Sequence, residues 1–153
     1  MIENVIVALA WLATQPQAET VPSYESEVVC VAKAIYHEAR GEPLAGQIRV
    51  GRVVINRMRD RRWPESACEV VYQPYQFEWT RNEPEIKEED AFARSIYLAS
   101  AVYNMVLMAD YKPKRPALYF FNPEKVQPIW ARDLHHVTHI GGHLFLTDTV
   151  SDE

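Results

Sequence analysis

The spacing of apolar residues changes once along this chain, and that change limits the folds open to it. Up to about Ala109 the apolar residues recur at helical intervals. The last third, in ALYFFNP and HVTHIGGHLFLT, alternates or runs apolar with β-branched and aromatic residues. Helices followed by strands, rather than alternating with them, are typical of an α+β domain. We therefore expect a mostly helical α+β fold with a small C-terminal β-hairpin that turns at Gly141-Gly142.

Four helices are expected before that change. The first begins near Ser23, a residue type that caps helices, and runs to about Arg40. Its apolar stripe consists of Val28, Val31, Ala32, Ile35 and Ala39. The others are expected from Pro43 to just before Trp63, at about 65–71 and at about 88–109. The segment QPYQFEWT, residues 73–80, is expected to be a loop or an irregular strand.

The N-terminal residues are set apart from the main domain. A length of 153 residues favours one domain with its own core, which we place at residues 23–153, after an apolar segment and linker at residues 1–22. The apolar run Val5–Ala13 is too short to cross a bilayer, so no stable membrane span is expected. Because Glu3 stands where a signal peptide carries basic residues, a short packed or frayed helix is favoured over a secretion signal.

Charge and cysteine content narrow the list of partners. A net charge of -5 argues against nucleic-acid binding, and we expect a monomer. Cys30 and Cys68 fit neither a CxxC nor a zinc-site spacing, so neither a metal nor another cofactor is expected. They form either a disulfide, worth about 4 kcal/mol in the chain-entropy model, or two buried thiols. The residues alone leave both open.

Glu38 is the side chain whose position most favours chemistry. On a helical wheel it lies at the edge of the apolar stripe, beside Ile35 and Val31, while His37 points toward solvent. Burial at this edge disfavours the charged carboxylate and raises its pKa, as does the negative end of the helix dipole. A carboxyl that stays protonated near neutral pH is what a general acid needs in order to protonate a glycosidic oxygen.

Less specific roles exist for both glutamates of this segment. Glu38 is also placed to form a salt bridge with Arg40 or Arg52, and periodicity alone favours that role because border carboxylates usually pair with a cation. Glu42, beyond Gly41, is expected to cap the second helix rather than to take part in catalysis.

The histidines give little support to a metal site. His37-Glu38 begins like HExxH, but Gly41 stands where the second histidine is required. Four histidines lie closer together in the sequence: His135, His136, His139 and His143. Gly141-Gly142 would break any helix that brought all four together. We therefore expect hydrogen-bonding or exposed histidines and no bound metal.

Aromatic residues gather in two segments of the chain. They are Tyr75, Phe77, Trp79, Tyr119, Phe120, Phe121 and Trp130. Most aromatic residues in such runs form core. An aromatic groove with Gln76 and Asn122 beside it would also suit sugar rings, whose C–H faces stack on aromatic rings while their hydroxyl groups form hydrogen bonds.

Several motifs, in this order, resemble the SleB/CwlJ-type cell-wall hydrolases, the family of spore cortex-lytic enzymes. They are IYHEARGEPLAGQIRVGRVVINRM, WPESACEVVYQPYQFEWT, ALYFFNP, an isolated tryptophan and IGGHLF. Their order and spacing hold from about Cys30 to Leu146. Two positions depart from the pattern, since Tyr75 stands where glycine is usual and Glu78 where a small polar residue is usual.

The resemblance implies a lysozyme-like catalytic domain that acts on the glycan strands of peptidoglycan. It implies that Glu38, the first glutamate of EARGE, is the catalytic acid. Four residues match motif positions of the family and are expected to bind substrate: Gln76, Phe77, Asn122 and His143. Trp79 and Tyr119 are expected to add aromatic rings to the same site. Glu42 and Glu78 are the candidates for a second carboxylate.

The expected reaction is cleavage of the MurNAc–GlcNAc bond by a lytic transglycosylase or a muramidase with one catalytic glutamate, in the periplasm or outside the cell. Because no separate wall-binding domain accompanies the motifs, we expect a phage endolysin or a minimal bacterial hydrolase, with the route of export left open. The alternatives are an N-acetylmuramoyl-L-alanine amidase, which would need a metal or a nucleophile, and a non-catalytic wall-binding module.

Overall fold

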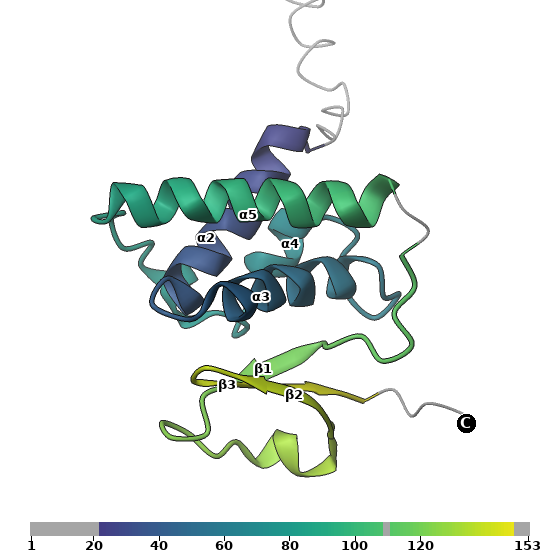
Figure 1. Cartoon of the computed structure of the whole chain (residues 1–153). Coiled ribbons are helices and arrows are strands. Elements are labelled where there is room, and N and C mark those ends of the chain that lie inside the picture. The colour runs from purple at the N-terminus through teal and green to yellow at the C-terminus, as the bar shows by residue number, and fades with distance from the viewer. Residues whose placement is uncertain (1–21, 109–110, 149–153) are drawn as a thin grey trace, which may run out of the picture.

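A computed structural model describes residues 22–108 and 111–148, and Figure 1 shows helices on one side of a small sheet. The four α-helices of these ranges are α2 (Tyr24–Ala39), α3 (Leu44–Met58), α4 (Ala67–Val71) and α5 (Glu89–Met108). The expected helices are confirmed to within a few residues. Pro43 is the N-cap of α3 rather than part of its first turn. The expected N-terminal segment lies almost wholly outside the described residues.

The sheet has three antiparallel strands, β1 (Tyr119–Phe121), β2 (His135–Ile140) and β3 (His143–Thr147), in the order β1-β3-β2. The expected hairpin is confirmed, because β2 and β3 pair across Gly141-Gly142. The sheet has one strand more than this hairpin, because β1 pairs with the other edge of β3. The expected loop at residues 73–80 continues into a short 3₁₀ helix, η1 (Glu78–Arg81), and a second one, η2 (Ile129–Asp133), precedes β2.

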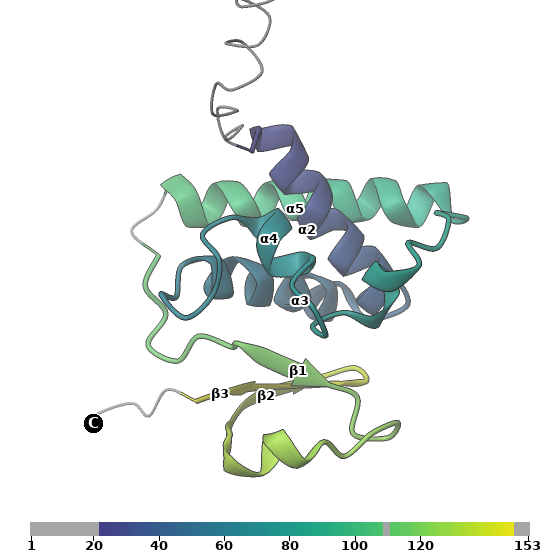
Figure 2. The same cartoon turned by 180° about the vertical axis from the view of Figure 1, so that it is seen from behind.

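Helix α2 runs through the centre of the helical layer, against α5 and α3 (Figures 1 and 2). It begins where Ser23 Oγ accepts a hydrogen bond of 3.2 Å from the backbone N–H of Ser26, which satisfies one of the free donors of the first turn. Its stripe is fully buried at Val31 and Ile35. The helix therefore forms because its apolar face is covered, since its length alone gives little stability in water.

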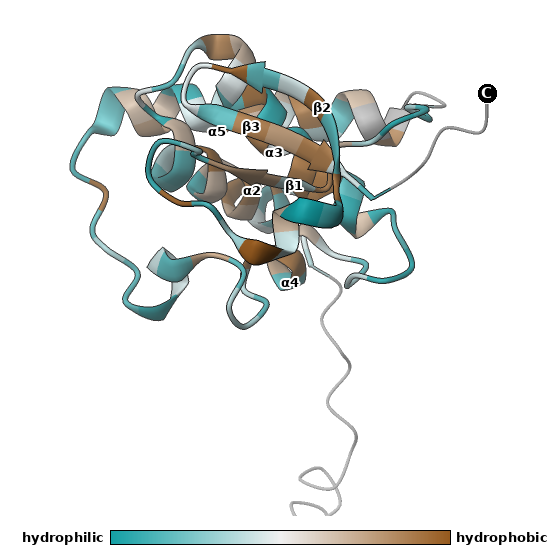
Figure 3. Ribbon diagram, turned by 90° about the horizontal axis from the view of Figure 1, so that it is seen from below, coloured by the Kyte–Doolittle hydropathy of each residue, from teal (hydrophilic) through white to brown (hydrophobic). Residues whose placement is uncertain are grey.

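The apolar core has two parts, one inside the helical layer and one between that layer and the sheet. The first joins all four helices. The second joins the end of α2, α3 and the sheet through Ala39, Val50, Val53, Ala117 and Phe145. Figure 3 shows the hydrophobic colouring of β3 between its two neighbours, and β3 is the most buried of the three strands. The sheet thus packs against one side of the helical layer.

Two polar side chains of α3 attach the sheet to the helical layer. Asn56 Nδ2 donates a hydrogen bond of 2.9 Å to the carbonyl oxygen of Ala117. Arg57 Nε donates one of 2.7 Å to the carbonyl oxygen of Leu118. Both carbonyls lie just before β1, and both donors are buried, so these bonds fix the position of that strand relative to α3.

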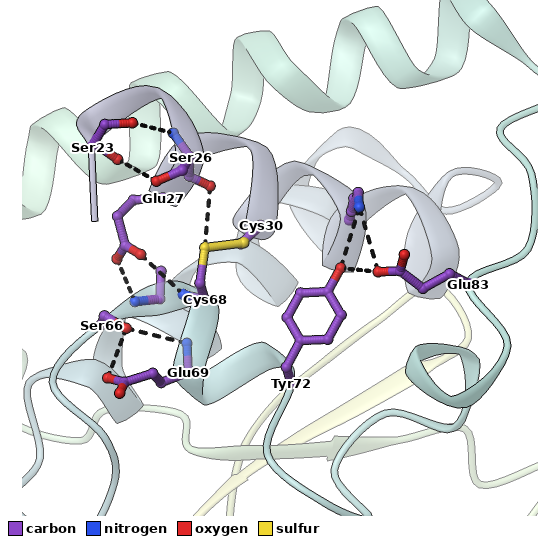
Figure 4. Close-up of a disulfide and its surroundings, with 11 residues drawn as sticks. Ser23, Ser26, Glu27, Cys30, Ser66, Cys68, Glu69, Tyr72 and Glu83 are labelled. Carbon is purple, nitrogen blue, oxygen red and sulfur yellow. Dashed lines mark hydrogen bonds and ion pairs between the residues drawn. A yellow bond between two sulfur atoms is a disulfide. The ribbon is translucent and has the colours of Figure 1, made fainter. Parts of the chain in front are cut away.

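A disulfide joins Cys30 on α2 to Cys68 on α4, with the two Cα atoms 5.1 Å apart (Figure 4). Of the two states that the sequence leaves open, the disulfide is therefore the one formed. The buried carboxylate of Glu27 accepts hydrogen bonds from the backbone N–H groups of Ala67 and Cys68, the latter at 3.2 Å. A helix of five residues does not form in isolation. The disulfide and Glu27 hold α4 in place.

No helix in the described ranges is long and apolar enough to span a bilayer.

Candidate active site

Glu38 lies in the last turn of α2, half-buried, where two pockets meet. The first pocket, of about 400 Å³, lies between the helical layer and the sheet, and α2, α3, the loop before η1, β1 and η2 all contribute to its lining: Glu38, Arg57, Tyr75, Gln76, Phe77, Tyr119, Phe120 and Trp130. The second, of about 350 Å³, lies around the α2–α3 turn and includes His37, Arg40, Glu42 and Lys125. Glu38 is the one described residue that both linings share.

The surroundings of Glu38 raise the pKa of its carboxyl group above the ordinary value. Burial is the main cause, and the nearby negative charge of Glu78 adds to it. The indole N–H of Trp79 and the charge of Lys125 act in the opposite direction. Among the described residues, Trp79 Nε1 is buried and has no hydrogen-bond partner within 3.5 Å. The raised pKa confirms the direction expected from the helical wheel.

The alternative for Glu38, a salt bridge with Arg40 or Arg52, is not formed. Arg40 Nε pairs instead with Glu88 Oε1 at 2.7 Å, and Arg52 Nη2 points to Met105 Sδ at 3.7 Å. Within residues 22–108 and 111–148, Glu38 has no ion-pair partner. The pKa of Glu38 therefore stays raised, because Lys125 and Trp79 stabilise the charged form less than burial disfavours it.

His37 does not point into solvent as the helical wheel indicated. It is half-buried, and its ring stacks on that of Trp79 with the centroids 4.4 Å apart and the planes at 26°. Burial and the neighbouring charges of Arg40 and Lys33 lower the pKa of the imidazole. The stack therefore fixes the indole of Trp79 beside Glu38, and a residue of η1 covers a helix face that the periodicity assigned to water.

Arg57 organises the floor of the first pocket. Its buried guanidinium donates through Nη1 to Gln76 Oε1 at 3.0 Å and lies over the ring of Tyr119, 5.7 Å from the centroid. Burial lowers the pKa of Arg57 to about 10, which leaves it charged at neutral pH. Tyr119 is held in turn by its hydroxyl group, which donates to Asp148 Oδ2 at 3.1 Å. Arg57 was not identified from the sequence as a site residue, although it lies near the end of the first motif, IYHEARGEPLAGQIRVGRVVINRM.

Glu42 does not cap α3, because Pro43 is the N-cap and no side chain bonds there. Glu42 Oε2 instead accepts a hydrogen bond of 2.8 Å from the backbone N–H of Gly142, one hundred residues further along the chain. Gly141 has φ 56°, in the region that glycine adopts most readily. Glu42, the second glutamate of EARGE, thus attaches the β2–β3 turn to the start of α3. The EARGE and IGGHLF motifs are in contact through this bond.

We predict that Gly141→Ala destabilises the protein by about 2 kcal/mol or more, because φ is positive there. The new Cβ atom would also lie 2.1 Å from Glu42 Oε2 and 2.7 Å from Pro43 Cδ. Gly41→Ala is the matched control, because no atom lies within 4 Å of its added Cβ. Denaturant unfolding of both variants checks the prediction, and equal midpoints for the two would contradict it.

The remaining expected site residues fall into two groups. Gln76, Phe77 and Tyr119 line the first pocket with Glu38, and Trp79 lies beside it. Asn122 and His143 line neither pocket: Asn122 Oδ1 accepts from the N–H of Glu124 at 2.9 Å, and His143 is buried against Phe120. Glu78, at the start of η1, is exposed. Roles in substrate contact or catalysis for all of these remain predictions.

The histidine group is spread along the hairpin. His135, His136 and His139 are exposed on β2, and His143 is on β3. A spacing of four residues on a strand separates His135 and His139 by about 13 Å, too far for both to bind one ion. In the part of the chain that the structure describes, no cluster of three or more histidine, cysteine, aspartate or glutamate residues could hold a metal ion.

Comparison with known proteins assigns this architecture to a family. The family model described as "Cell Wall Hydrolase" matches residues 41–146, more than half of the chain. The chain belongs to the cell wall hydrolase family. The resemblance stated from the motifs is confirmed, and the chain is an enzyme of that family by descent. The match begins just after Glu38, so the role of that residue rests on the structure and on the EARGE motif.

The curated relatives include the spore cortex-lytic enzymes of Bacillus subtilis (strain 168) and Oceanobacillus iheyensis. They are 28% and 29% identical to this chain over 120 and 121 residues, which is 78% and 79% of the chain. The chain covers only 37% and 41% of their lengths. These relatives therefore support the family assignment and leave the activity of this chain to be argued from its site.

Two solved structures share the fold. The catalytic domain of the germination-specific lytic transglycosylase SleB from Bacillus anthracis has a TM-score of 0.63 and covers 86% of this chain and 100% of that domain. The catalytic domain of the Bacillus cereus SleB protein has a TM-score of 0.58 and covers 87% of this chain and 99% of that one. Both are 24% identical to it. The mostly helical fold with a small C-terminal sheet is thus that of SleB catalytic domains.

Proposed function

We propose that this chain cleaves the MurNAc–GlcNAc bond of peptidoglycan glycan strands as a lytic transglycosylase, with Glu38 as the catalytic residue. One observation carries the proposal: an unpaired, half-buried carboxyl of raised pKa lies where two open pockets meet. A polymer that occupied both pockets would place one of its internal linkages at that carboxyl. The name of the solved Bacillus anthracis relative, a lytic transglycosylase, supports this choice of reaction.

The first step needs a proton on Glu38, and the raised pKa of its carboxyl group favours the protonated form. The carboxyl donates this proton to the glycosidic oxygen as the bond to C1 of the MurNAc unit breaks, and the GlcNAc alcohol leaves. The positive charge that develops on the sugar is then next to the newly formed carboxylate. A general acid of this kind contributes roughly 10²- to 10⁴-fold to the rate.

The second step returns the proton to Glu38. The carboxylate removes the proton of the C6 hydroxyl group of the same MurNAc unit, and the C6 oxygen bonds to C1 to give a 1,6-anhydro ring. No water is consumed. One carboxylate suffices for this route because the nucleophile belongs to the substrate and is already in position.

Hydrolysis by a muramidase would need a second carboxylate at a defined distance from the first. Glu42 is unsuited to that task, because its carboxylate accepts the Gly142 N–H and braces the β2–β3 turn. Glu78 is exposed, and its charge already acts on Glu38. It is the residue through which water would be activated if the product were hydrolytic, and this keeps a muramidase as the second candidate.

The disulfide supports a site of action outside the cytoplasm, because disulfides persist in oxidising compartments. Peptidoglycan is accordingly the proposed substrate and main partner, and the names of the curated relatives raise spore cortex peptidoglycan as one form of it. The role of a phage endolysin, expected from the sequence, receives no support from these relatives, and we do not propose it.

Mass spectrometry of the fragments released from purified peptidoglycan tests the proposal. We expect muropeptides with 1,6-anhydro-MurNAc ends, each lighter by one water than its hydrolytic counterpart, and no effect of a chelator. Ordinary reducing ends would assign the chain as a muramidase. Free stem peptides would assign it as an amidase, and binding without any soluble fragment as a wall-binding module. Each of these three results contradicts the proposed transglycosylase.

A further inference from the structure

Tyr75 combines two properties that rarely occur together in a residue without a function. Its side chain is 87% exposed, so it contributes little to the core. It nevertheless lines the first pocket, which has Glu38 in its wall. An exposed aromatic ring at the rim of a catalytic pocket is positioned to contact whatever enters.

The backbone of Tyr75 is held in an unfavourable conformation. Its φ is 66°, in the left-handed region where a β-carbon is disfavoured and glycine is preferred. Glycine is also the residue that the family resemblance leads one to expect at this position. Such outliers persist at functional sites when the surrounding structure maintains them. Tyrosine at this position has a conformational cost that its small buried area does not offset.

The ring of Tyr75 also has a fixed neighbour. The guanidinium of Arg81, at the end of η1, lies over it at 5.5 Å from the centroid. The backbone N–H of the next residue, Gln76, closes a turn by donating to the carbonyl oxygen of Gln73 at 3.2 Å. A cation near the ring of an exposed tyrosine favours this position of the ring modestly.

A second exposed ring lines the same pocket from a distant part of the chain. Trp130, on η2, is 49% exposed and is supported by Tyr119 and Phe121, whose ring centroids lie 5.9 and 5.7 Å away. The pocket thus has aromatic rings from two segments at its rim. Polar groups of Gln76 and Arg57 belong to the same lining. This is the combination that a pyranose requires, with apolar C–H faces and hydroxyl groups at its edge.

We propose that Tyr75 is a substrate-contacting residue that this chain adds to the site: its ring packs against the C–H face of a sugar unit of the glycan strand in the first pocket, with Trp130 at the same rim. The proposal rests on the proposed function, because it takes a glycan as the ligand. Tyr75 binds the strand on one side of the scissile bond and takes no part in proton transfer.

The test measures binding without turnover. Glu38→Gln protein is titrated with glycan strands freed of stem peptides, and the dissociation constant is compared after a second change, Tyr75→Gly. We expect Tyr75→Gly to raise the dissociation constant about 10-fold, which is equivalent to a loss of about 1.4 kcal/mol of binding free energy. Tyr97→Ala is the matched control, an exposed tyrosine of α5 outside both pockets, and should change nothing. Tyr75→Phe should recover most of the affinity, because it keeps the ring.

Two further readouts separate contact from folding. With Glu38 intact, Tyr75→Gly should raise KM while kcat changes little, and its thermal midpoint should not fall, because glycine relieves the strain at φ 66°. Equal affinity of the Tyr75→Gly and Tyr97→Ala proteins would overturn the role of Tyr75 and leave the proposed reaction intact. An enzyme that releases no saccharide would refute the reaction, while the binding titration would still decide the role of Tyr75.

Discussion

Replacement of Glu38 by glutamine should lower the rate of fragment release from purified peptidoglycan by about 10³-fold, while the protein still folds and binds its substrate. Glutamine has the shape of the neutral carboxyl, but its amide protons are far too weakly acidic to be transferred to the glycosidic oxygen. Among the residues that the structure describes, the other carboxylates that line the two pockets both have structural contacts, since Glu42 accepts the Gly142 N–H and Glu88 pairs with Arg40. The loss should appear in kcat, because the group acts in the transition state.

Glu25→Gln is the matched control for this change. It alters the same atoms on the same helix, in an exposed first turn outside both pockets, and should leave the rate unchanged. Clearance of cell walls by the Glu38→Gln protein at the wild-type rate would remove Glu38 from the mechanism. A Glu38→Gln protein that unfolds would instead show that the carboxyl is structural.

The two proteins should also differ in how their stability depends on pH. The folded-state pKa of Glu38 is raised by burial, so the wild type gains stability from the neutral carboxyl below the unfolded-state pKa of about 4.3 and loses it as the pH rises through the folded value. Glutamine does not titrate. The Glu38→Gln protein should therefore match the wild type at acidic pH and become the more stable of the two as the pH rises.

Removal of the Cys30–Cys68 disulfide should destabilise the protein by about 4 kcal/mol, because the bridge restricts the unfolded chain over a separation of 38 residues. For a domain of this size the thermal midpoint should fall by roughly 10 °C. The double replacement of both cysteines by alanine, followed by calorimetry, measures the effect. The short helix α4 has little else to hold it besides Glu27 and its apolar contacts.

Reduction of the wild-type protein provides an independent control. The reduced wild type should unfold at about the temperature of the double variant, and the double variant should not respond to the reductant. Activity at low temperature should persist in both, because the disulfide lies outside the residues that line the two pockets. A double variant as stable as the oxidised wild type would contradict the structural role assigned to the bridge.

Local features of the fold were predictable, because the signals for them are local. Ser23 caps α2 as expected, and the stripe of α2 is buried where the helical spacing placed it. The Gly141-Gly142 turn joins the two strands that their β-branched and aromatic residues indicated. In each case the residues that determine the structure lie within a few positions of one another, so a single sequence contains the whole signal.

Contacts between distant segments were not predictable. The third strand, β1, pairs with β3 across more than twenty residues, and the composition alone gave only a hairpin. Glu42 was expected to cap its own helix, yet its partner is Gly142. His37 was assigned to solvent because the wheel contains no information about Trp79, which arrives from η1 to cover it. Periodicity describes one helix and cannot show what packs on its polar side.

In the candidate site, too, the features set by local sequence were predictable and the contacts between distant segments were not. Glu38 was found from the border of an apolar stripe, because burial of one helix face already determines the surroundings of its edge. The choice between a proton donor and a salt bridge depended on where Arg40 and Arg52 point, and their partners Glu88 and Met105 lie on or beside another helix. Arg57 became a candidate only when the pocket brought it together with Glu38, and Tyr75, one of several aromatic residues in the sequence, was placed in that pocket only by the fold.

The central claim is that the fold raises the pKa of the Glu38 carboxyl group, and a pH titration of its carboxyl carbon by ¹³C NMR tests this most directly. The Glu38→Gln protein identifies the resonance by its absence. We predict a midpoint above the ordinary value for glutamate, which falls when the charge of Glu78 is removed by Glu78→Gln. A midpoint at or below the ordinary value would contradict the account, because a carboxylate already ionised at that pH has no proton to give to the glycosidic oxygen.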